Sequence, residues 1–363
     1  MCRKIFVGAT GQHCGKTTIS LSLMHLARRK YRRVGFMKPV GPKCIEFKGH
    51  VVDKDAAMFA SVFGVEEDIA LMSPFTLTST TTRSFLDGEI DIEAPGEIIR
   101  AASAELESKY DFLIIEGAGH CGVGSVVGVN NAKVAAMLNA PVLLLTGGGI
   151  GNVIDAVELN LALYEREKAC VKVVMANKLV AEKRAHTMTY LKKAFAGSDM
   201  LVTGAFDYSP ILADPTLQHI SDLLGLPLRG DPGERTRICH NIQLGAASSQ
   251  IVIDHLDPST LLIVTSSRDE LLVTASALHH IPEYKSRLTG LLIAGHVPVS
   301  SITQRIIDDS GIPYIRIEET SSDIFYRLRE HVSKIGPEDI EKIDLINSIA
   351  ERYIDFDAID ATL

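Results

Sequence analysis

The chain has 363 residues, of which 46% are hydrophobic and 23% are charged, and its formal net charge is −8. These values exclude a mainly disordered chain, a collagen-like chain and a disulfide scaffold, and the length predicts about two domains. A mildly acidic surface argues against a general affinity for phosphate backbones, so we expect no nucleic-acid partner.

Cysteine usage and hydropathy bear on the cellular location. The six cysteines show no paired spacing, which predicts free thiols in a reducing compartment. The first residues hold too few apolar side chains for a signal-peptide core. The longest uncharged stretch, residues 134–154, contains a proline and four glycines, which favours a buried strand and loop over a membrane helix. We therefore expect a cytoplasmic protein without a membrane partner.

Short apolar runs alternate with segments of helical periodicity through the first two thirds of the chain. This alternation predicts an α/β fold, a doubly wound parallel sheet with helices on both faces. The predicted strands are Lys4–Val7, Arg33–Met37, Asp111–Ile115, Pro141–Leu145 and Lys172–Met175, and the predicted helices are Thr17–Arg29 and Asp53–Phe63.

A cluster of two prolines and two glycines within residues 226–234 indicates a linker. We predict a first domain over residues 1–225, a smaller α/β domain over 235–335, and a C-terminal helix with a tail over 336–363. The strands predicted after the linker are Ser259–Thr265, Gly290–Ala294 and Pro313–Ile317, and the helices are Glu270–His280, Ser300–Ser310, Ser322–Lys334 and Pro337–Asp355.

The segment GATGQHCGKTT, residues 8–18, follows a predicted strand and opens a predicted helix. Glycines allow backbone N–H groups to surround phosphate oxygens, and the helix N-terminus adds the positive end of its dipole. Lys16 is then expected to reach the β- and γ-phosphates and Thr17 to bind Mg²⁺. The strict motif has glycine where this chain has Thr10, but its Gly15-Lys16-Thr17 end is intact. We predict a nucleotide site formed by Thr10, Gly11, Gln12, His13, Cys14, Gly15, Lys16, Thr17 and Thr18.

Polar residues at the ends of two other predicted strands extend this site. Glu116 follows a strand expected beside the first one, and a carboxylate there suits Mg²⁺. Lys38 ends the second strand, at the sheet edge where doubly wound folds bind ligands. Asp53 and Asp55 begin a predicted helix, and we expect Asp53 to cap it and Asp55 to contact a metal or substrate.

Several of these segments, in the same order, resemble the dethiobiotin synthetase family of P-loop NTPases. They are residues 8–18, 38–40, 53–56, 116–119 and 176–178. A closer resemblance is to the dethiobiotin-synthetase-like domain at the N-terminus of long-form phosphate acetyltransferase, carried by residues 77–88, 117–126 and 147–154. The region after residue 235 resembles the DRTGG domain that follows it, and the acetyltransferase domain lies outside the resemblance.

The resemblance implies roles for individual residues. Lys16 and Thr17 would hold ATP phosphates and Mg²⁺, with Asp55 and Glu116 as further metal ligands. Lys38 would be catalytic together with Lys16, at the substrate carboxylate and the transferred phosphoryl group, where two lysines and Mg²⁺ neutralise charge. Asn177 would meet the nucleotide base. Val180 stands where guanine-specific loops have aspartate, which favours ATP.

Two functions remain open. One is a regulatory protein that binds Mg-ATP in its first domain, senses a small metabolite in its second, and acts on a partner such as an acetyltransferase. The alternative is an ATP-dependent ligase that activates the carboxylate or carbamate of a small acid. The resemblance also implies a homodimer.

Weaker patterns have competing interpretations. His13-Cys14 and His120-Cys121 fit a zinc site or simple loop filling, and an oxidation-sensitive Cys14 is a further hypothesis. The glycines at 147–151 fit a tight turn better than a dinucleotide fingerprint. The basic residues 28–33 fit a solvated face. The segment 266–269 fits either an anion site shared with Asn241 or a helix cap provided by Ser267.

Overall fold

The structure is a computed structural model that describes residues 2–209, 212, 214–329 and 335–363. The chain forms two compact units, the first made of Met1–Ser209 with Ile340–Leu363 and the second of Pro210–Asp339. The second unit is thus an insertion in the sequence of the first. This division differs from the predicted boundaries at 225 and 336, because residues 217–224 pack in the second unit and the C-terminal helices pack on the first.

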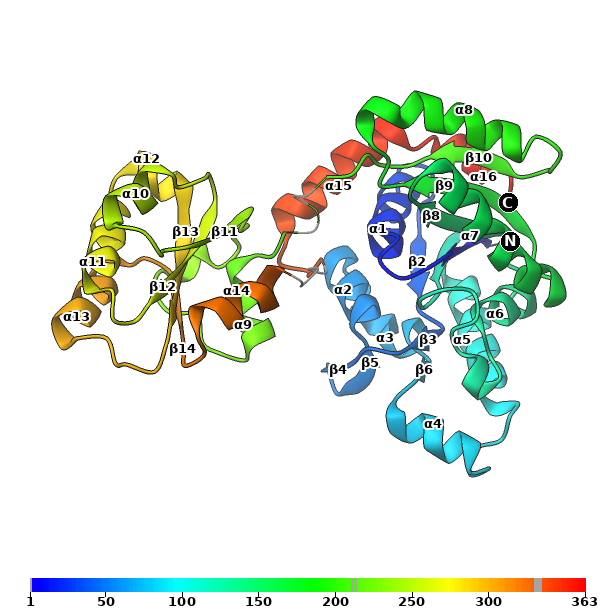
Figure 1. Cartoon of the computed structure of the whole chain (residues 1–363). Coiled ribbons are helices and arrows are strands. Elements are labelled where there is room, and N and C mark those ends of the chain that lie inside the picture. Colours follow the sequence, from blue (N-terminus) through cyan, green and yellow to red (C-terminus); the bar gives the residue numbers. More distant parts are fainter. Residues whose placement is uncertain (1, 210–211, 213, 330–334) are drawn as a thin grey trace. The chain divides into compact units, whose positions relative to one another are not determined.

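The first unit is built around a parallel six-stranded sheet with the strand order β10-β9-β8-β1-β7-β2 (Figure 1). The five strands predicted in this region are all present, and their ends differ from the predicted ones by at most two residues. The sixth, β10, was not predicted. The bounds are β1 Arg3–Ala9, β2 Val34–Met37, β7 Phe112–Glu116, β8 Val142–Gly147, β9 Val171–Asn177 and β10 Leu201–Gly204.

Helices cover both faces of this sheet, as predicted (Figure 1). On one face, side chains of the strands and of helices α5, α6 and α7 form one apolar core, which includes Leu113, Ile99 and Val157. On the other face, Phe36 stacks on Phe59 of α2 with ring centroids 3.8 Å apart. The helices are α1 Lys16–Ala27, α2 Lys54–Phe63, α3 Ile69–Met72, α4 Ser79–Leu86, α5 Ala94–Lys109, α6 Asn131–Met137, α7 Ile150–Arg166, α8 Arg184–Ala194, α15 Ile340–Tyr353 and α16 Phe356–Asp360.

The segment between β2 and α5 contains two small two-stranded sheets. One is parallel and the other is an antiparallel hairpin, and both lie in stretches for which no strand was predicted. Their strands are β3 Val40–Gly41 with β6 Phe75–Thr76, and β4 Cys44–Phe47 with β5 His50–Asp53.

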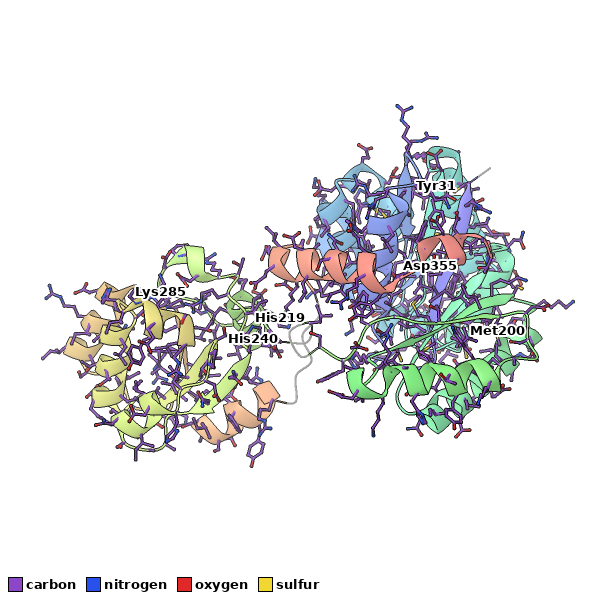
Figure 2. The ribbon with its side chains drawn as sticks, turned by 90° about the horizontal axis from the view of Figure 1, so that it is seen from above. Tyr31, Met200, His219, His240, Lys285 and Asp355 are labelled. Carbon is purple, nitrogen blue, oxygen red and sulfur yellow. The ribbon has the colours of Figure 1, made fainter. Side chains whose placement is uncertain are left out.

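The C-terminal helices α15 and α16 return to the first unit and pack along α1. The ring of Phe356 lies 5.6 Å from that of Phe112 in β7. The buried carboxylate of Asp360 binds Arg3, Lys30 and Tyr31. Arg3 begins β1, and Lys30 and Tyr31 lie shortly after the end of α1. Figure 2 labels Tyr31 in this region. Lys30 and Arg29, expected on a solvated face, are therefore ion-paired with the C-terminal segment.

The second unit has a parallel four-stranded sheet in the order β11-β12-β13-β14. Apolar cores lie on both faces, one with α10, α11 and α13 and the other with α9 and α14. The predicted helix 322–334 is observed as far as Arg329, and residues 330–334 lie outside the described part. The elements are β11 Asn241–Leu244, β12 Thr260–Thr265, β13 Leu288–Ala294, β14 Tyr314–Ile317, α9 Leu217–Leu224, α10 Ser249–Asp254, α11 Asp269–Leu278, α12 Pro282–Arg287, α13 Ser301–Ser310 and α14 Ser321–Arg329.

Within the described residues, every helix is too short or too polar to cross a bilayer.

Candidate functional site

The predicted site residues of the first unit gather at one edge of its sheet. All six strands are parallel, so their carboxyl ends share an edge. The glycine loop follows β1, Lys38 follows β2, Glu116 ends β7 and Asn177 ends β9. Asp55 reaches the same edge from the first turn of α2, which Asp53 caps by accepting a hydrogen bond from the Asp55 N–H at 2.9 Å. The capping role of Asp53 and the position of β7 beside β1 are confirmed.

The glycine loop enters α1 through Gly15, whose φ of 94° is a conformation that favours glycine. The side-chain amide of Asn177 donates to the carbonyl of Cys14 at 2.9 Å and accepts from the N–H of Phe206 at 3.1 Å. A Cβ atom at position 15 would lie 2.5 Å from the nitrogen of that amide. Asn177 thus ties the loop to β9, and its contact with a nucleotide base stays a prediction.

Lys16 opens α1 and is largely buried. Its ammonium donates to the carbonyl of Gly119 at 2.7 Å. The pKa of Lys16 is lowered to about 8, because burial and the positive charge of Lys38 outweigh the opposing effect of Glu116. At 1.36 kcal/mol per unit, keeping this ammonium charged costs about 3 kcal/mol. An anionic phosphate beside Lys16 would offset that cost.

Lys38 lies in a buried cluster with the two acids. Its Nζ is 2.7 Å from Oε1 of Glu116 and 2.9 Å from Oδ2 of Asp55, and it also donates to the carbonyl of Gly117 at 3.4 Å. The side chain of Lys38 is 3% exposed. Burial by itself would lower the pKa of Lys38, but the carboxylates of Glu116 and Asp55 outweigh it and raise that pKa, so the amine stays protonated.

The donor set fits a magnesium ion. Oε2 of Glu116 is buried and has no hydrogen-bond partner in the described structure, so a hard carboxylate oxygen is left for a cation. The hydroxyl of Thr17 belongs to the first turn of α1, and Asp55 shares Lys38 with Glu116. These three residues would hold Mg²⁺, and the phosphate oxygens of a nucleotide would supply further ligands.

Two buried asparagines shape the loops around the site, and sequence reasoning missed both. Asn131 accepts from the N–H of Ala118 at 3.1 Å and donates to the carbonyls of Ala118 and His120 at 2.6 Å each. Asn160 of α7 accepts from the N–H of Cys121 and donates to the carbonyl of Thr10, both at 3.4 Å. Asn131 begins α6, 11 to 13 residues after the groups that it binds, and Asn160 lies 39 and 150 residues from its two partners. The sequence therefore carries no local pattern that marks them.

The weaker candidates have mixed outcomes. Among the described residues, no group of three or more His, Cys, Asp or Glu side chains is arranged to hold a metal, which removes the support for zinc at Cys14 and Cys121. The glycines at 147–149 form the expected turn, since Gly149 precedes α7 directly.

For the segment 266–269 in the second unit, the cap by Ser267 and the contribution of Asn241 are wrong, and an anion site at 266–269 itself stays a prediction. The residue that precedes α11 is Arg268, without a side-chain cap, so capping by Ser267 is wrong. The guanidinium of Arg268 donates to the carbonyls of Gly245 and Ala247. Asn241 begins β11 and donates to the carbonyl of Pro258, so it lies at the opposite sheet edge from the end of β12.

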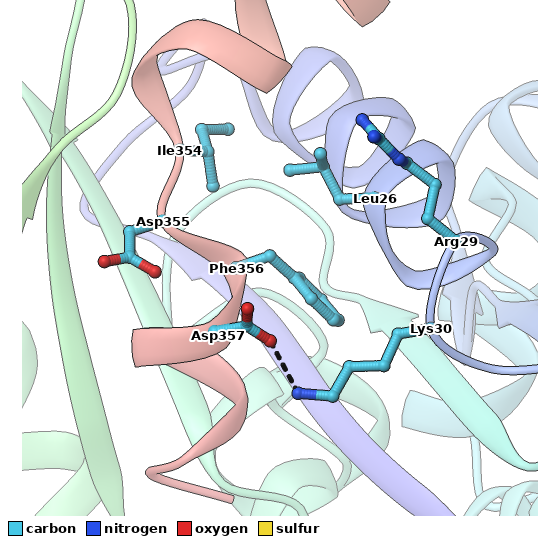
Figure 3. Close-up of a pocket in the computed structure, with 7 residues that line it drawn as sticks. All are labelled: Leu26, Arg29, Lys30, Ile354, Asp355, Phe356 and Asp357. Carbon is cyan, nitrogen blue, oxygen red and sulfur yellow. Dashed lines mark hydrogen bonds and ion pairs between the residues drawn. The ribbon is translucent and has the colours of Figure 1, made fainter.

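A pocket of about 480 Å³ lies away from this site (Figure 3). Its lining comes from the end of α1 and the segment between α15 and α16: Leu26, Arg29, Lys30, Ile354, Asp355, Phe356 and Asp357. The 12 residues of α1 span about 18 Å, which separates this pocket from the phosphate loop at the other end of the helix.

A glycine loop between β1 and α1, a lysine and a threonine that open α1, and an acid at the end of the neighbouring strand define a P-loop protein of the α/β class. Comparison with known families agrees. A family model described as an AAA domain matches residues 3–216, and one described as a DRTGG domain matches residues 220–330. The chain belongs to this AAA-domain family, with a DRTGG domain following.

Relatives extend over the whole chain. The phosphate acetyltransferase of Nitratidesulfovibrio vulgaris is 22% identical over 372 residues, which cover 100% of this chain and 52% of the relative. The ATP-dependent dethiobiotin synthetase BioD of Aromatoleum aromaticum is 29% identical over 149 residues, 41% of this chain and 66% of that protein. This chain spans about half the length of the phosphate acetyltransferases that it matches.

Among solved structures, cobyrinic acid a,c-diamide synthase from Mycobacterium smegmatis with bound ADP and magnesium covers 58% of this chain and 87% of its own. The sequence identity is 15% and the TM-score is 0.39. The predicted resemblance to a dethiobiotin-synthetase-like P-loop domain followed by a DRTGG domain is confirmed by the family and relative matches.

Proposed function

We propose that the first unit binds Mg-ATP and that the DRTGG unit regulates this protein, or a partner, in response to a small metabolite. The observation that carries the nucleotide half is the unpartnered, buried Oε2 of Glu116 at the sheet edge where Lys16 and Thr17 begin α1. A buried carboxylate oxygen without a donor is costly unless a cation completes it.

Each predicted residue has a task in this proposal. The backbone amides of residues 10–18 surround the phosphates, and Lys16 neutralises their charge. Thr17, Asp55 and Glu116 hold the metal, which would compensate phosphate charge. Asn177 contacts the base, and the absence of an aspartate after Lys178 favours adenine over guanine.

The regulatory half rests on the chain's organisation. The DRTGG unit is inserted between Ser209 and Ile340, so it is joined to the first unit at both of its ends. Its C-terminal connection leads into α15, which packs along α1, the helix that begins with Lys16. A ligand of the second unit that shifts α15 would therefore act on the phosphate loop through one helix.

Titration calorimetry of the full chain with Mg-ATP tests nucleotide binding, with Lys16→Ala as the variant that should lose it. The absence of heat and of a thermal shift with magnesium and any purine triphosphate would end the proposal. Coupling is tested by measuring ATP affinity with and without candidate metabolites. Equal affinities for every metabolite that binds would remove the regulatory half.

A ligase of the dethiobiotin synthetase type is the second candidate, favoured by the Lys38 side chain beside the acids and by the BioD relative. It predicts ADP release that depends on one small carboxylic acid, and loss of turnover in Lys38→Ala with ATP binding retained. A screen of acids without stimulated turnover would exclude it.

Partners and location complete the proposal. We propose a homodimer, which light scattering tests directly, and an acetyltransferase as the protein partner, because relatives of twice this length are phosphate acetyltransferases. We also propose a cytoplasmic location, supported by six free cysteines.

A further inference from the structure

The Lys38 ammonium bridges the same two carboxylates that the metal requires. It lies 2.9 Å from Asp55 and 2.7 Å from Glu116, both distances of charge-assisted hydrogen bonds. It also donates a longer hydrogen bond to the carbonyl of Gly117 at 3.4 Å. The lysine therefore binds the acids in the way that a cation in this site would.

Burial strengthens the electrostatic interactions within this group of three side chains. The side chains of Lys38, Asp55 and Glu116 are 3%, 9% and 1% exposed. Two carboxylates held together away from water repel each other strongly, and a positive charge between them offsets this repulsion. The structure supplies that charge from within the chain.

The pairing also sets the charge that an incoming metal meets. Lys38 holds both acids by direct ion pairs, Lys16 adds a second positive charge nearby, and the buried carboxyl of Asp53 lies close to Lys38 as well. A free divalent ion would have to compete with the Lys38 ammonium for Asp55 and Glu116, and the two ammonium groups would repel it. A nucleotide phosphate adds several negative charges at the same point, and then the ion is attracted.

We propose that Lys38 is an internal counter-ion of the metal carboxylates, which prevents a divalent ion from binding until a nucleotide phosphate arrives with it. This inference rests on the proposed Mg-ATP site. It makes Lys38 a positioning residue that orients both acids and leaves Oε2 of Glu116, which has no hydrogen-bond partner in the described structure, available for a metal.

The experiment is a titration of the full chain with Mn²⁺ in the absence of nucleotide. Electron paramagnetic resonance measures the concentration of free Mn²⁺ at each step. Wild type and Lys38→Arg, which keeps the charge, should bind Mn²⁺ weakly. Lys38→Met, which keeps the length and removes the charge, should bind it at least about tenfold more tightly. The double variant Lys38→Met/Glu116→Gln should lose this gain, which separates the site from surface carboxylates.

The inference is overturned if wild type binds Mn²⁺ without nucleotide as tightly as Lys38→Met does. If Lys38→Met does not fold without metal, its thermal unfolding is measured with and without Mn²⁺. A cooperative transition that returns with Mn²⁺ supports the inference, and the lack of such a transition overturns it. These titrations contain no nucleotide. A failure of wild type to bind Mg-ATP is therefore a separate result that concerns the proposed function alone.

Discussion

Asp360, near the C-terminus, offers the sharpest test of how the C-terminal segment belongs to the nucleotide-binding unit. Its side chain is 2% exposed, and it accepts from the guanidinium of Arg3 at 3.0 Å and from the hydroxyl of Tyr31 at 2.8 Å. The ammonium of Lys30 lies 2.8 Å from its other oxygen. A single carboxylate thus ties α16 to β1 and to the residues that follow α1.

Asp360→Asn keeps the shape of this side chain and removes its charge. Hydrogen bonds to a charged group contribute about 1.5–3 kcal/mol, but Arg3 and Lys30 are 42% and 43% exposed, which screens their share. We therefore expect the free energy of unfolding of the first unit to fall by about 2 kcal/mol at pH 7. Asp357→Asn is the matched control, because Asp357 also pairs with Lys30 but is 82% exposed. Its effect should be much smaller.

The pH dependence gives an independent check. Burial would raise the pKa of Asp360, but Lys30, Tyr31 and Arg3 outweigh burial and lower that pKa below its ordinary value. A carboxyl with a lowered pKa in the folded state stabilises the protein above its unfolded pKa of about 4, and this contribution is lost as the pH falls further. The difference between wild type and Asp360→Asn should therefore be constant from pH 7 to 5 and shrink below about pH 4.

Urea unfolding followed by circular dichroism measures both effects, since the chain has no tryptophan to report by fluorescence. Wild type, Asp360→Asn and Asp357→Asn are compared at each pH. If the two variants lose equal stability at pH 7, or if the Asp360→Asn difference is unchanged at pH 3, a buried charge network at Asp360 is refuted.

Three further substitutions test the site and its support. Gly15→Ala should abolish Mg-ATP binding in calorimetry, because φ at position 15 is positive and the added Cβ would clash with Asn177. Gly149→Ala is the control, because φ at position 149 is negative and the added Cβ would meet open space, so binding should not change. Asn131→Ala should cost about 2 kcal/mol in urea unfolding, because it leaves buried groups of the 118–120 loop unpaired, and an unchanged midpoint would contradict the contacts described. Phe356→Ala should cost about 3 kcal/mol in the same assay through loss of its packing on Phe112, and a change below 1 kcal/mol would mean that α16 is not anchored there.

Much of the first sheet could be predicted because five of its six strands are short apolar runs bounded by glycine or polar residues. The strands β1, β2, β7, β8 and β9 carry this signal, since a parallel strand is buried on both faces. The edge strand β10 and the small sheet β4–β5 lack it, because their exposed residues dilute the apolar pattern. Sequence patterns of half-exposed strands are ambiguous by nature.

The phosphate loop, Asp55 and Glu116 could be predicted because their chemistry is local in sequence. The glycine loop lies between a strand and a helix. Glu116 is the last residue of β7, and Asp55 lies in the first turn of α2. Asn131 and Asn160 could not, because no sequence pattern links them to the backbone groups that they bind, which lie 11 to 13 residues away for Asn131 and 39 and 150 residues away for Asn160. Their asparagine type indicates a hydrogen bond but not its partner.

The sequence by itself determined the class of fold, the phosphate loop and the presence of a second α/β unit, because these depend on periodicity and on motifs of a few adjacent residues. Only the tertiary structure decided that Lys38 binds the carboxylates of Asp55 and Glu116, that Asn177 holds the loop, and that the C-terminal helices return to α1. The physical reason is that the partners of a buried charged or polar group determine its energy and its role. Those partners come from strands and helices that only folding brings together.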